Sequence, residues 1–274
     1  MSSSHLLGTV PVDPLRVSAD LAQVEPFGYV DSYTEFVCGS WRTCMLWNWN
    51  GDSADARIRD YTGAAQVTEF GRKLGYVEEL MSANFDLSKL RFARLTRLAP
   101  GTVVLPHRDY VELESDLVRI HVPLRTADKA YASEEETIYR MGQGQVWFLD
   151  ATRVHSIANF AKCDRIHLLL DFQADHPASV FSGQHREALS MPAEAAVPRR
   201  PLRPGEREAF TALASIADME NLMDIAAMVI RRYFVADLPV LDVFGWLREI
   251  ADASGDQDVA GRVRWLESHC LSSR

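Results

Sequence analysis

LVRIHVPL, at residues 117–124, alternates apolar and polar side chains in the way that a β-strand presents two faces. RIHLLLDF, at residues 165–172, repeats this alternation. Each stretch carries Arg-x-His on its polar side, as Arg119 with His121 and as Arg165 with His167. Such a polar side is either the solvated surface of a sheet or the lining of a polar cavity inside a barrel. The repeated Arg-x-His favours the cavity, because Lys, Glu, Thr or Ser would serve equally well at a solvated surface.

Further short β-rich runs lie around these two stretches. RFARLTRL at residues 91–98 and QVWFLD at residues 145–150 are also rich in apolar and β-branched side chains. Turn residues such as Pro100-Gly101 separate the runs. Because no helical pattern interrupts the strands, the sequence from about 27 to 180 predicts an antiparallel sandwich or barrel.

Helices are expected before and after the β-rich runs of residues 91–172. Apolar residues spaced by three and four predict an amphipathic helix over residues 65–81. Prolines gather in residues 192–204, which are typical of a linker. Two apolar stripes follow, one with Val240, Phe244, Leu247 and Ala251 and one with Val263, Leu266 and Cys270. We therefore expect a mainly β domain with N-terminal helical elements over 1–180, a Pro-rich linker over 181–204 and a small α-helical region over 205–274.

Composition is that of an ordinary soluble globular protein, and it argues against several functions. The 274 residues are 47% hydrophobic and 24% charged, with a net charge of −9. This acidic balance argues against a nucleic-acid partner. No apolar run is long enough to span a membrane, and the N-terminal sequence lacks the pattern of a signal peptide. Four cysteines without a CxxC motif indicate reduced thiols and a cytoplasmic location, and we assign no role to them.

Four of the eight histidines lie between residues 107 and 167. His107 and Asp109 are two residues apart and project to the same side of an extended segment. His155 follows the apolar strand 145–150 and is the third candidate ligand. Two His and one carboxylate leave open positions on a metal, as in non-haem Fe(II) oxygenases. A zinc hydrolase is the competing interpretation, although the helical HExxH motif that often serves it is absent from the sequence.

Arg165, ten residues after His155 and on the polar side of the next strand, favours the iron oxygenase. A 2-oxoglutarate co-substrate binds iron through its keto acid end and presents a second carboxylate some distance away. A planar guanidinium binds that carboxylate through two parallel hydrogen bonds, a geometry that Lys cannot match. The three candidate ligands and this arginine therefore predict an iron(II)/2-oxoglutarate oxygenase.

Four stretches carry a resemblance to a known family: PHRDYVELES, VRIHVPL, MGQGQVWFLDATRVHS and RIHLLLD. They resemble the bacterial hydroxylases of free L-proline, the cis-3 and cis-4 enzymes, and their pipecolic acid relatives. These enzymes belong to the aspartyl/asparaginyl hydroxylase-like branch of the iron(II)/2-oxoglutarate-dependent dioxygenases. The likeness extends to FVCGSWRTCMLWN at 36–48, LRFARLTRL at 90–98 and FGWLREI at 244–250, so it covers most of the chain.

The resemblance implies a fold and a catalytic centre. The fold is a double-stranded β-helix core of the jelly-roll or cupin type, followed by a small helical C-terminal region. The implied catalytic iron ligands are His107, Asp109 and His155. The implied 2-oxoglutarate site is Arg165, helped by His121. Fe(II), 2-oxoglutarate and O2 are the expected cofactor and co-substrates, and ascorbate is expected to support activity in vitro.

The resemblance also implies how the substrate is bound. Arg94 and Arg119 match the arginines that hold the carboxylate of a free amino acid, with Trp41 as a pocket wall and Arg97 able to assist. The expected reaction is cis-hydroxylation of L-proline at position 3 or 4, or hydroxylation of L-pipecolic acid, with release of succinate and CO2. Neither the substrate ring, the ring position nor the oligomeric state follows from the sequence.

Two other functions stay open at this point. The substrate could be a linear amino acid or an Asp or Asn side chain in a polypeptide, which would need an open groove. Alternatively, the chain could be a metal-binding β-barrel without activity. Among the remaining residues, His167 is expected to be a satisfied core histidine or a histidine that supports the site from behind, rather than a direct ligand. The run from Glu134 to Glu136 is expected to be a solvated loop.

Overall fold

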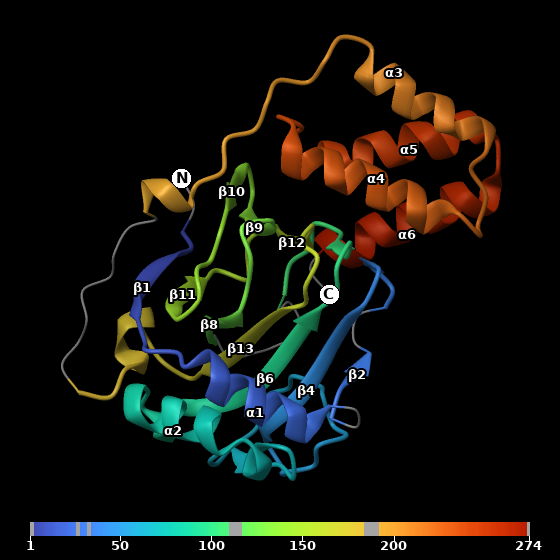
Figure 1. Ribbon diagram of the computed structural model, residues 1–274. Coiled ribbons are helices and arrows are strands. Elements are labelled where there is room, and N and C mark those ends of the chain that lie inside the picture. The colour runs from blue at the N-terminus through green and yellow to red at the C-terminus, as the bar shows by residue number, and fades with distance from the viewer. Residues whose placement is uncertain (1–2, 26–27, 32–33, 110–116, 184–191, 273–274) are drawn as a thin grey trace.

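Two antiparallel β-sheets form the centre of the molecule, described by a computed structural model that covers residues 3–25, 28–31, 34–109, 117–183 and 192–272 (Figure 1). The larger sheet runs in the order β1 (His5–Thr9), β11 (Gln145–Leu149), β8 (Val118–Arg125), β13 (Arg165–Phe172), β6 (Leu90–Leu98), β4 (Trp41–Asn48) and β2 (Val30–Asp31), with β5 (Gln66–Val67) also pairing with β4. The smaller sheet runs in the order β10 (Thr137–Tyr139), β9 (Ala130–Glu134), β12 (His155–Asn159), β7 (Val103–Val104) and β3 (Val37–Cys38).

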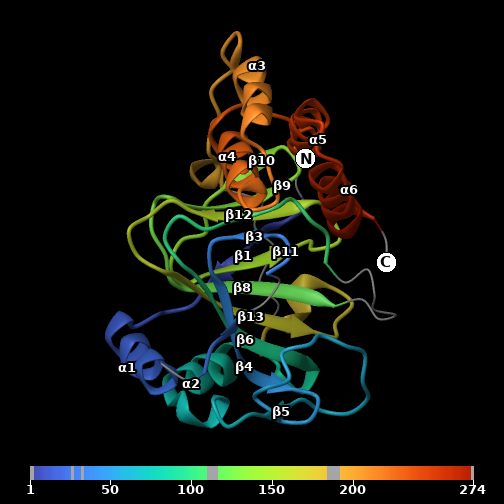
Figure 2. The same cartoon turned by 90° about the vertical axis from the view of Figure 1, so that its right-hand side faces the viewer.

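The two sheets lie one above the other as layers of a jelly roll (Figure 2). Their strands pair out of chain order, since β13 lies between β6 and β8, and β12 lies between β9 and β7. Such pairing buries the central strands between neighbours and leaves side chains alternating between the two faces of each sheet. The mainly β core predicted from the sequence, with a double-stranded β-helix arrangement, is confirmed.

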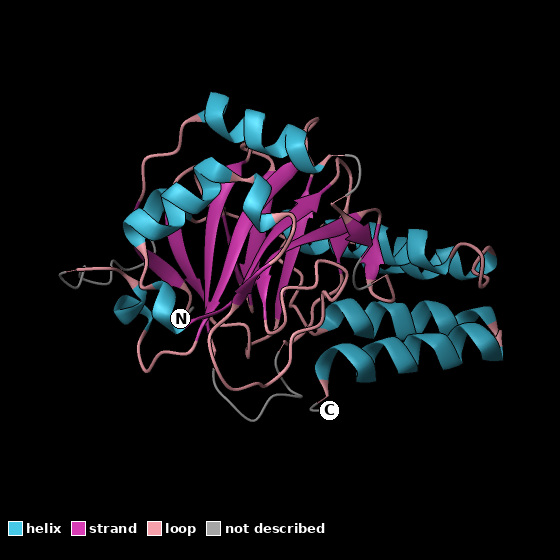
Figure 3. Cartoon of the chain, turned by 90° about the horizontal axis from the view of Figure 1, so that it is seen from below, coloured by secondary structure: helices cyan, strands magenta, loops and turns pink. Residues whose placement is uncertain are grey.

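Two helices cover the outer face of the larger sheet (Figure 3). Helix α1 (Pro14–Val24) begins where the Asp13 side chain accepts hydrogen bonds from the backbone N–H groups of Leu15 and Arg16, an N-cap that suits a proline at the first helical position. Helix α2 (Gly75–Asn84) follows later in the chain. Both pack their buried apolar residues into one cluster with the outward side chains of β6, β8 and β13.

The helix predicted over 65–81 begins later than its apolar spacing indicates. Residues 66–67 form β5 against β4, and a 3-10 turn, η1 (Gly71–Lys73), precedes α2. The Thr68 hydroxyl donates to the Met45 carbonyl at 2.7 Å and accepts a hydrogen bond from the Gly71 N–H at 3.1 Å. A side chain at Gly71 would meet the Leu46 carbonyl oxygen 2.4 Å away. These contacts with β4 hold residues 66–73 against the sheet and so override the helical period.

The C-terminal region consists of helices α3 (Glu206–Thr211), α4 (Leu222–Val235), α5 (Asp242–Ser254) and α6 (Gln257–Leu271), with a 3-10 turn, η5 (Ala212–Ser215), after α3. The predicted apolar stripes are buried here, in one cluster with residues of the smaller sheet. Helix α4 packs on β3 and β7, next to the segment that carries the candidate metal ligands. A helical C-terminal region is therefore confirmed.

The predicted linker joins the two parts of the chain. It contains a short 3-10 turn, η4 (Ala193–Ala195), and two more such turns, η2 (Leu87–Lys89) and η3 (Pro177–Val180), lie earlier in the chain. Within the linker, residues 184–191 lie outside the described ones. The boundaries at residues 180 and 205 stay a prediction.

Glu134 is not part of a solvated loop, contrary to expectation. It ends β9 and has no exposed surface. Its carboxylate accepts hydrogen bonds from the backbone N–H of Ser3 at 2.6 Å and of Ser4 at 2.9 Å. Because a buried carboxylate must be compensated by donors, the N-terminal segment supplies what water would supply elsewhere. Only Glu136, at the end of the run, is exposed.

Candidate active site

The three candidate metal ligands lie on two neighbouring segments of the smaller sheet. His107 and Asp109 follow β7, and His155 is the first residue of β12. His107 and His155 pair as an antiparallel bridge, in which each backbone N–H donates to the other residue's carbonyl at 2.9 Å. The backbone N–H of Asp109 donates to the Ala151 carbonyl at 2.8 Å. The sheet hydrogen bonds therefore fix the spacing of all three residues.

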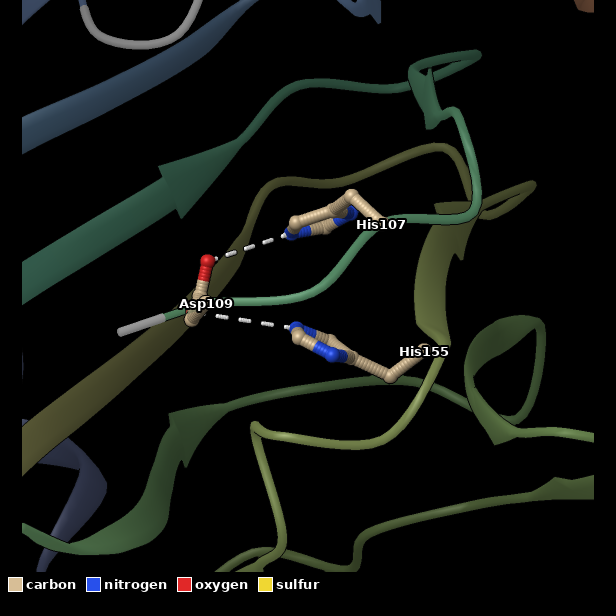
Figure 4. Close-up of side chains that lie close together, drawn as sticks. All are labelled: His107, Asp109 and His155. Atoms are coloured by element: carbon tan, nitrogen blue, oxygen red, sulfur yellow. Dashed lines mark ion pairs between the residues drawn. The ribbon is translucent and has the colours of Figure 1, made fainter. Parts of the chain in front are cut away.

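The three side chains converge on one point (Figure 4). The Nε2 atom of His107 lies 3.6 Å from one carboxylate oxygen of Asp109, and the Nε2 atom of His155 lies 3.7 Å from the other. One ligand atom from each residue lies within 4.8 Å of the others. Among the described residues, this is the one group of three or more His, Cys, Asp or Glu side chains that could hold a metal.

Hydrogen bonds fix which nitrogen of each imidazole faces the centre. The Nδ1 atom of His107 lies 2.8 Å from the Leu105 carbonyl, and that of His155 lies 3.0 Å from the Arg153 carbonyl. A carbonyl only accepts, so Nδ1 carries the proton and the lone pair of Nε2 points toward Asp109. The Nε2 atom of His107 is buried and has no hydrogen-bond partner among the described residues.

The charges of the group suit a cation. Burial lowers the pKa of His107 to about 4, so its imidazole is neutral at neutral pH. Burial opposes ionisation of Asp109, yet Arg119 and the two histidines together bring its pKa below the usual range, so it is a carboxylate. Two imidazoles and one carboxylate form the donor set that binds non-haem Fe(II), and the residues present fit that metal.

The inner face of the larger sheet lies opposite the metal ligands. In the strand register, Asp171 lies opposite both Arg119 and Phe92, and Leu169 lies opposite both His121 and Arg94. One step along, His167 lies opposite Thr96, and Arg165 opposite Leu98. Because directly paired residues point to the same face, the polar sides of 117–124 and 165–172 form one wall. Arg119 touches Asp109 from this wall, so the wall faces the metal ligands.

At one end of this wall, two buried arginines share a carboxylate. Arg119 donates from Nε to Asp171 at 2.8 Å and from Nη1 to Asp109. The Nη2 atom of Arg94 lies 3.8 Å from Asp171, and the Nε atom of Arg94 is buried with no hydrogen-bond partner among the described residues. The predicted substrate residues Arg94 and Arg119 are thus brought together, beside the metal ligands.

The other end of the wall holds a cation without a partner. Arg165 is buried, and its guanidinium makes no hydrogen bond or ion pair with any described residue. Burial lowers its pKa to about 10, which leaves it charged at neutral pH. Burying an unpaired charge costs folding free energy, so such a cation is typical of a site that binds an anionic ligand.

Two buried histidines lie beside Arg165. Their rings are 5.8 Å apart, and neither ring nitrogen of His121 or His167 has a hydrogen-bond partner among the described residues. Burial is the main reason why the pKa of both histidines lies well below the usual value, and the positive charge of Arg165 lowers it further. His167 is therefore buried beside the site, and no described residue satisfies its ring nitrogens, so it is not a satisfied core histidine. The alternative, a histidine that supports the site, stays a prediction. Both neutral rings can bind a polar ligand.

Two further residues predicted for the substrate pocket lie on opposite faces of the larger sheet. Trp41 begins β4 opposite Leu98, at the Arg165 end of the inner wall, and is partly buried. Arg97 lies on the outer face, where it pairs with Asp164 at 2.8 Å and Glu25 at 2.9 Å. Arg97 therefore does not reach the cavity, because an odd step along β6 turns it away from Arg94. No role is predicted for Asp171 from the sequence. Its place on the polar side of 165–172, with Arg165 and His167, is the sequence feature that could have indicated one.

Comparison with known proteins identifies the family of this chain. The sequence model of the aspartyl/asparaginyl β-hydroxylase family matches residues 14–175, and that of the L-proline 3-hydroxylase C-terminal domain matches residues 177–274. The chain belongs to the aspartyl/asparaginyl β-hydroxylase family. The resemblance seen in the sequence is therefore confirmed.

Curated relatives of this family member match over nearly the whole chain. L-proline cis-4-hydroxylase of Rhizobium meliloti is 30% identical over 273 residues, which are 99% of this chain and 97% of the relative. L-proline cis-3-hydroxylase 2 of a Streptomyces species is 31% identical over 283 residues, which cover 99% and 96% of the two chains. Together these matches make the chain an iron(II)/2-oxoglutarate-type dioxygenase enzyme.

A structural comparison adds a distant neighbour. A 2OG-Fe(II) oxygenase family oxidoreductase from Burkholderia pseudomallei matches 59% of this hydroxylase and 79% of its own chain, at 11% identity and a TM-score of 0.39. The family assignment rests on the sequence matches alone. None of the helices within the described residues has the length and apolarity that crossing a bilayer requires.

Proposed function

We propose that this dioxygenase hydroxylates a free cyclic amino acid, L-proline or L-pipecolic acid, using Fe(II), 2-oxoglutarate and O2. The observation that carries the proposal is a triad that can hold a metal, facing a sheet wall that carries the buried, unpartnered Arg165. His121 lies on the same inner face as Arg165, opposite Leu169, with its ring 5.8 Å from that of His167. The names of the relatives, which are L-proline hydroxylases, support the substrate.

Each proposed role follows from a side chain's chemistry and position. His107, Asp109 and His155 would hold iron and, since they share one side of it, leave positions open for ligands. When bound, iron and 2-oxoglutarate together supply the oxidising power for hydroxylation, with succinate and CO2 as co-products. Arg165 would pair with the distal carboxylate of 2-oxoglutarate in a bidentate manner, and a neutral His121 would donate a hydrogen bond to the same molecule.

Substrate binding is assigned to the other end of the cavity. Arg94 has an unpartnered Nε atom and lies beside the triad, so it would hold the carboxylate of the amino acid, with Arg119 next to it. The predicted pocket wall Trp41 stands opposite Leu98, at the Arg165 end of the inner wall, so it would line the site away from the amino acid carboxylate. A fixed carboxylate sets which ring carbon faces the metal, and the protein's contribution to the reaction is chiefly this positioning. A cavity closed between two sheets also keeps water away from the reacting atoms.

The proposal includes the division of the chain and the conditions of activity. Residues 1–180 would form the dioxygenase domain, 181–204 the linker and 205–274 the helical region, which the change of matching family sequence model between residues 175 and 177 supports. Ascorbate would keep the iron reduced during assay. The partner is a small molecule, and a cytoplasmic location remains part of the proposal.

The test is incubation with Fe(II), 2-oxoglutarate, ascorbate and air, in parallel reactions with L-proline, L-pipecolic acid, linear amino acids and an Asp-containing peptide. Succinate that forms only with the cyclic amino acids, together with a product carrying one extra oxygen atom, supports the proposal. NMR of the product then gives the ring position. Turnover of the peptide or of a linear amino acid alone would overturn the substrate assignment. A chain that binds metal but turns over none of these would be a binding protein.

A further inference from the structure

A fully buried carboxylate that no catalytic role accounts for lies next to the metal ligands. Asp171, near the end of β13, has no exposed surface. It accepts hydrogen bonds from Arg119 Nε at 2.8 Å and from Nη2 at 3.4 Å, and lies 3.8 Å from Arg94 Nη2. The register explains this contact, because Asp171 stands directly opposite Arg119 on the neighbouring strand.

Arg119 extends this pair to the metal ligands. Its Nη1 atom donates to the Asp109 oxygen that faces His155, while its other two nitrogens are turned to Asp171. One rigid guanidinium therefore connects a carboxylate of the metal triad to a carboxylate of the opposite sheet. Since a guanidinium is planar, the orientation of its Asp171 edge also fixes the orientation of its Asp109 edge.

The negative charge of Asp171 compensates buried positive charges around it. Arg94, Arg119 and Arg165 lie on one face of the larger sheet, and all three are buried. Buried cations need nearby anions, and a carboxylate between Arg94 and Arg119 offsets their mutual repulsion. The Asp171 carboxylate is turned to Arg119 and Arg94, so we expect its effect to pass through these two arginines.

We propose that Asp171 is a positioning residue that orients Arg119 against the metal ligand Asp109 and keeps Arg94 directed at the substrate carboxylate. This inference rests on the proposed function for the identity of metal and substrate. Arg119 then serves first to orient Asp109, and Arg94 carries the larger share of substrate binding. Outer partners of metal ligands typically change metal affinity about 10- to 100-fold when removed.

The test is Asp171→Asn, which keeps the shape but places a neutral amide, with an N–H donor, against a guanidinium. Metal affinity is measured without turnover, by titrating Mn(II) and following its electron paramagnetic resonance signal. We expect the Kd for Mn(II) to rise about tenfold. At saturating Fe(II), KM for the amino acid should rise more than KM for 2-oxoglutarate, because Arg165 lies at the far end of the wall. Asp171→Glu, which keeps the charge, should restore part of the metal affinity.

Asp164→Asn is the matched control. Asp164 accepts a hydrogen bond from Arg97 at 2.8 Å. Like the Asp171–Arg119 pair, this ion pair joins neighbouring strands near a strand end, but it lies on the outer face of the sheet. The Asp164→Asn substitution should leave both the Kd for Mn(II) and the KM values unchanged. If Asp171→Asn does not fold, Arg119→Lys tests the same link, since a lysine cannot bridge two carboxylates with one rigid group.

The outcomes separate this inference from the proposed function. An unchanged Kd for Mn(II) in folded Asp171→Asn, or an equal loss in Asp164→Asn, would overturn the positioning role. A wild-type protein that binds no metal would instead overturn the proposed function. Loss of metal affinity in Asp171→Asn with a normal control and partial rescue by glutamate would support the inference.

Discussion

His107 and His155 exchange two backbone hydrogen bonds, each N–H donating to the other's carbonyl at 2.9 Å. These two bonds place both imidazoles on one side of the smaller sheet, with ring centroids 4.3 Å apart. The metal site is therefore built into the backbone pairing, so removing a ligand side chain should affect metal binding far more than folding.

Replacing His155 by alanine tests the triad. We expect His155→Ala to abolish turnover and to weaken Mn(II) binding at least about 10-fold, because one of three protein ligands is lost. His176→Ala is the control, since His176 is exposed and its Nδ1 atom accepts a hydrogen bond from the Ala178 backbone N–H, outside the group that could hold a metal. Calorimetric titration with Mn(II) gives the affinity, and near-normal turnover in His155→Ala would show that another residue supplies the third ligand.

Replacing Arg165 by lysine tests the co-substrate pocket. We expect Arg165→Lys to raise KM for 2-oxoglutarate about tenfold or more, because an ammonium group cannot form two parallel bonds with a carboxylate. The Kd for Mn(II) should stay unchanged. Arg97→Lys, a change on the outer face of the same sheet, should leave KM for 2-oxoglutarate as in the wild type. Equal effects of the two changes would count against the assigned contact.

Replacing His121 by phenylalanine tests its proposed hydrogen bond to the co-substrate. Both of its ring nitrogens lack partners among the described residues, so the protein loses no internal hydrogen bond and the ring still fills its space. We expect KM for 2-oxoglutarate to rise several-fold, as for loss of one hydrogen bond of about 1 kcal/mol, with the melting temperature nearly unchanged. Thermal unfolding and steady-state kinetics check this, and an unaltered KM would remove His121 from the pocket.

Glu206 gives a pH-dependent contribution to stability. Hydrogen bonds from the Arg200 side chain and the Arg203 backbone, and then the charge of Arg232, lower its pKa to about 2 from an ordinary 4.5. A pKa lower in the folded than in the unfolded state stabilises the fold above the unfolded value. That contribution is lost as the pH falls through the interval between 4.5 and about 2.

Glu206→Gln should therefore lower the free energy of unfolding by about 1–2 kcal/mol near neutral pH, and by progressively less as the pH falls below 4.5. Urea unfolding at several pH values measures the difference. Glu208→Gln, an exposed change in the same helix, is the control. A difference from the wild type that stays constant over this pH range would contradict the assignment.

Much of the fold could be predicted from strand alternation. The polar sides of 117–124 and 165–172 do form one inner wall, because alternation fixes the face of every residue once one is placed. The same rule places Arg94 and Arg97 on opposite faces of the sheet. Which of the two faces the site depends on the register with neighbouring strands, which the sequence of one strand does not give. The failed helix over 65–81 and the buried Glu134 depend on contacts with β4 and with the N-terminal segment, which are distant in the chain. Asp171 shows its role only when its neighbour Arg119 is known.

The central claim is that a triad and an unpartnered guanidinium in one cavity carry out an O2-dependent hydroxylation of a cyclic amino acid. The most direct measurement is a reaction under isotopically labelled dioxygen, with Fe(II), 2-oxoglutarate and L-proline or L-pipecolic acid, followed by mass spectrometry. We predict one labelled oxygen atom in the hydroxylated amino acid and one in succinate, formed in equal amounts. Oxygen in the product that comes from water, or no product with either ring, would contradict the account.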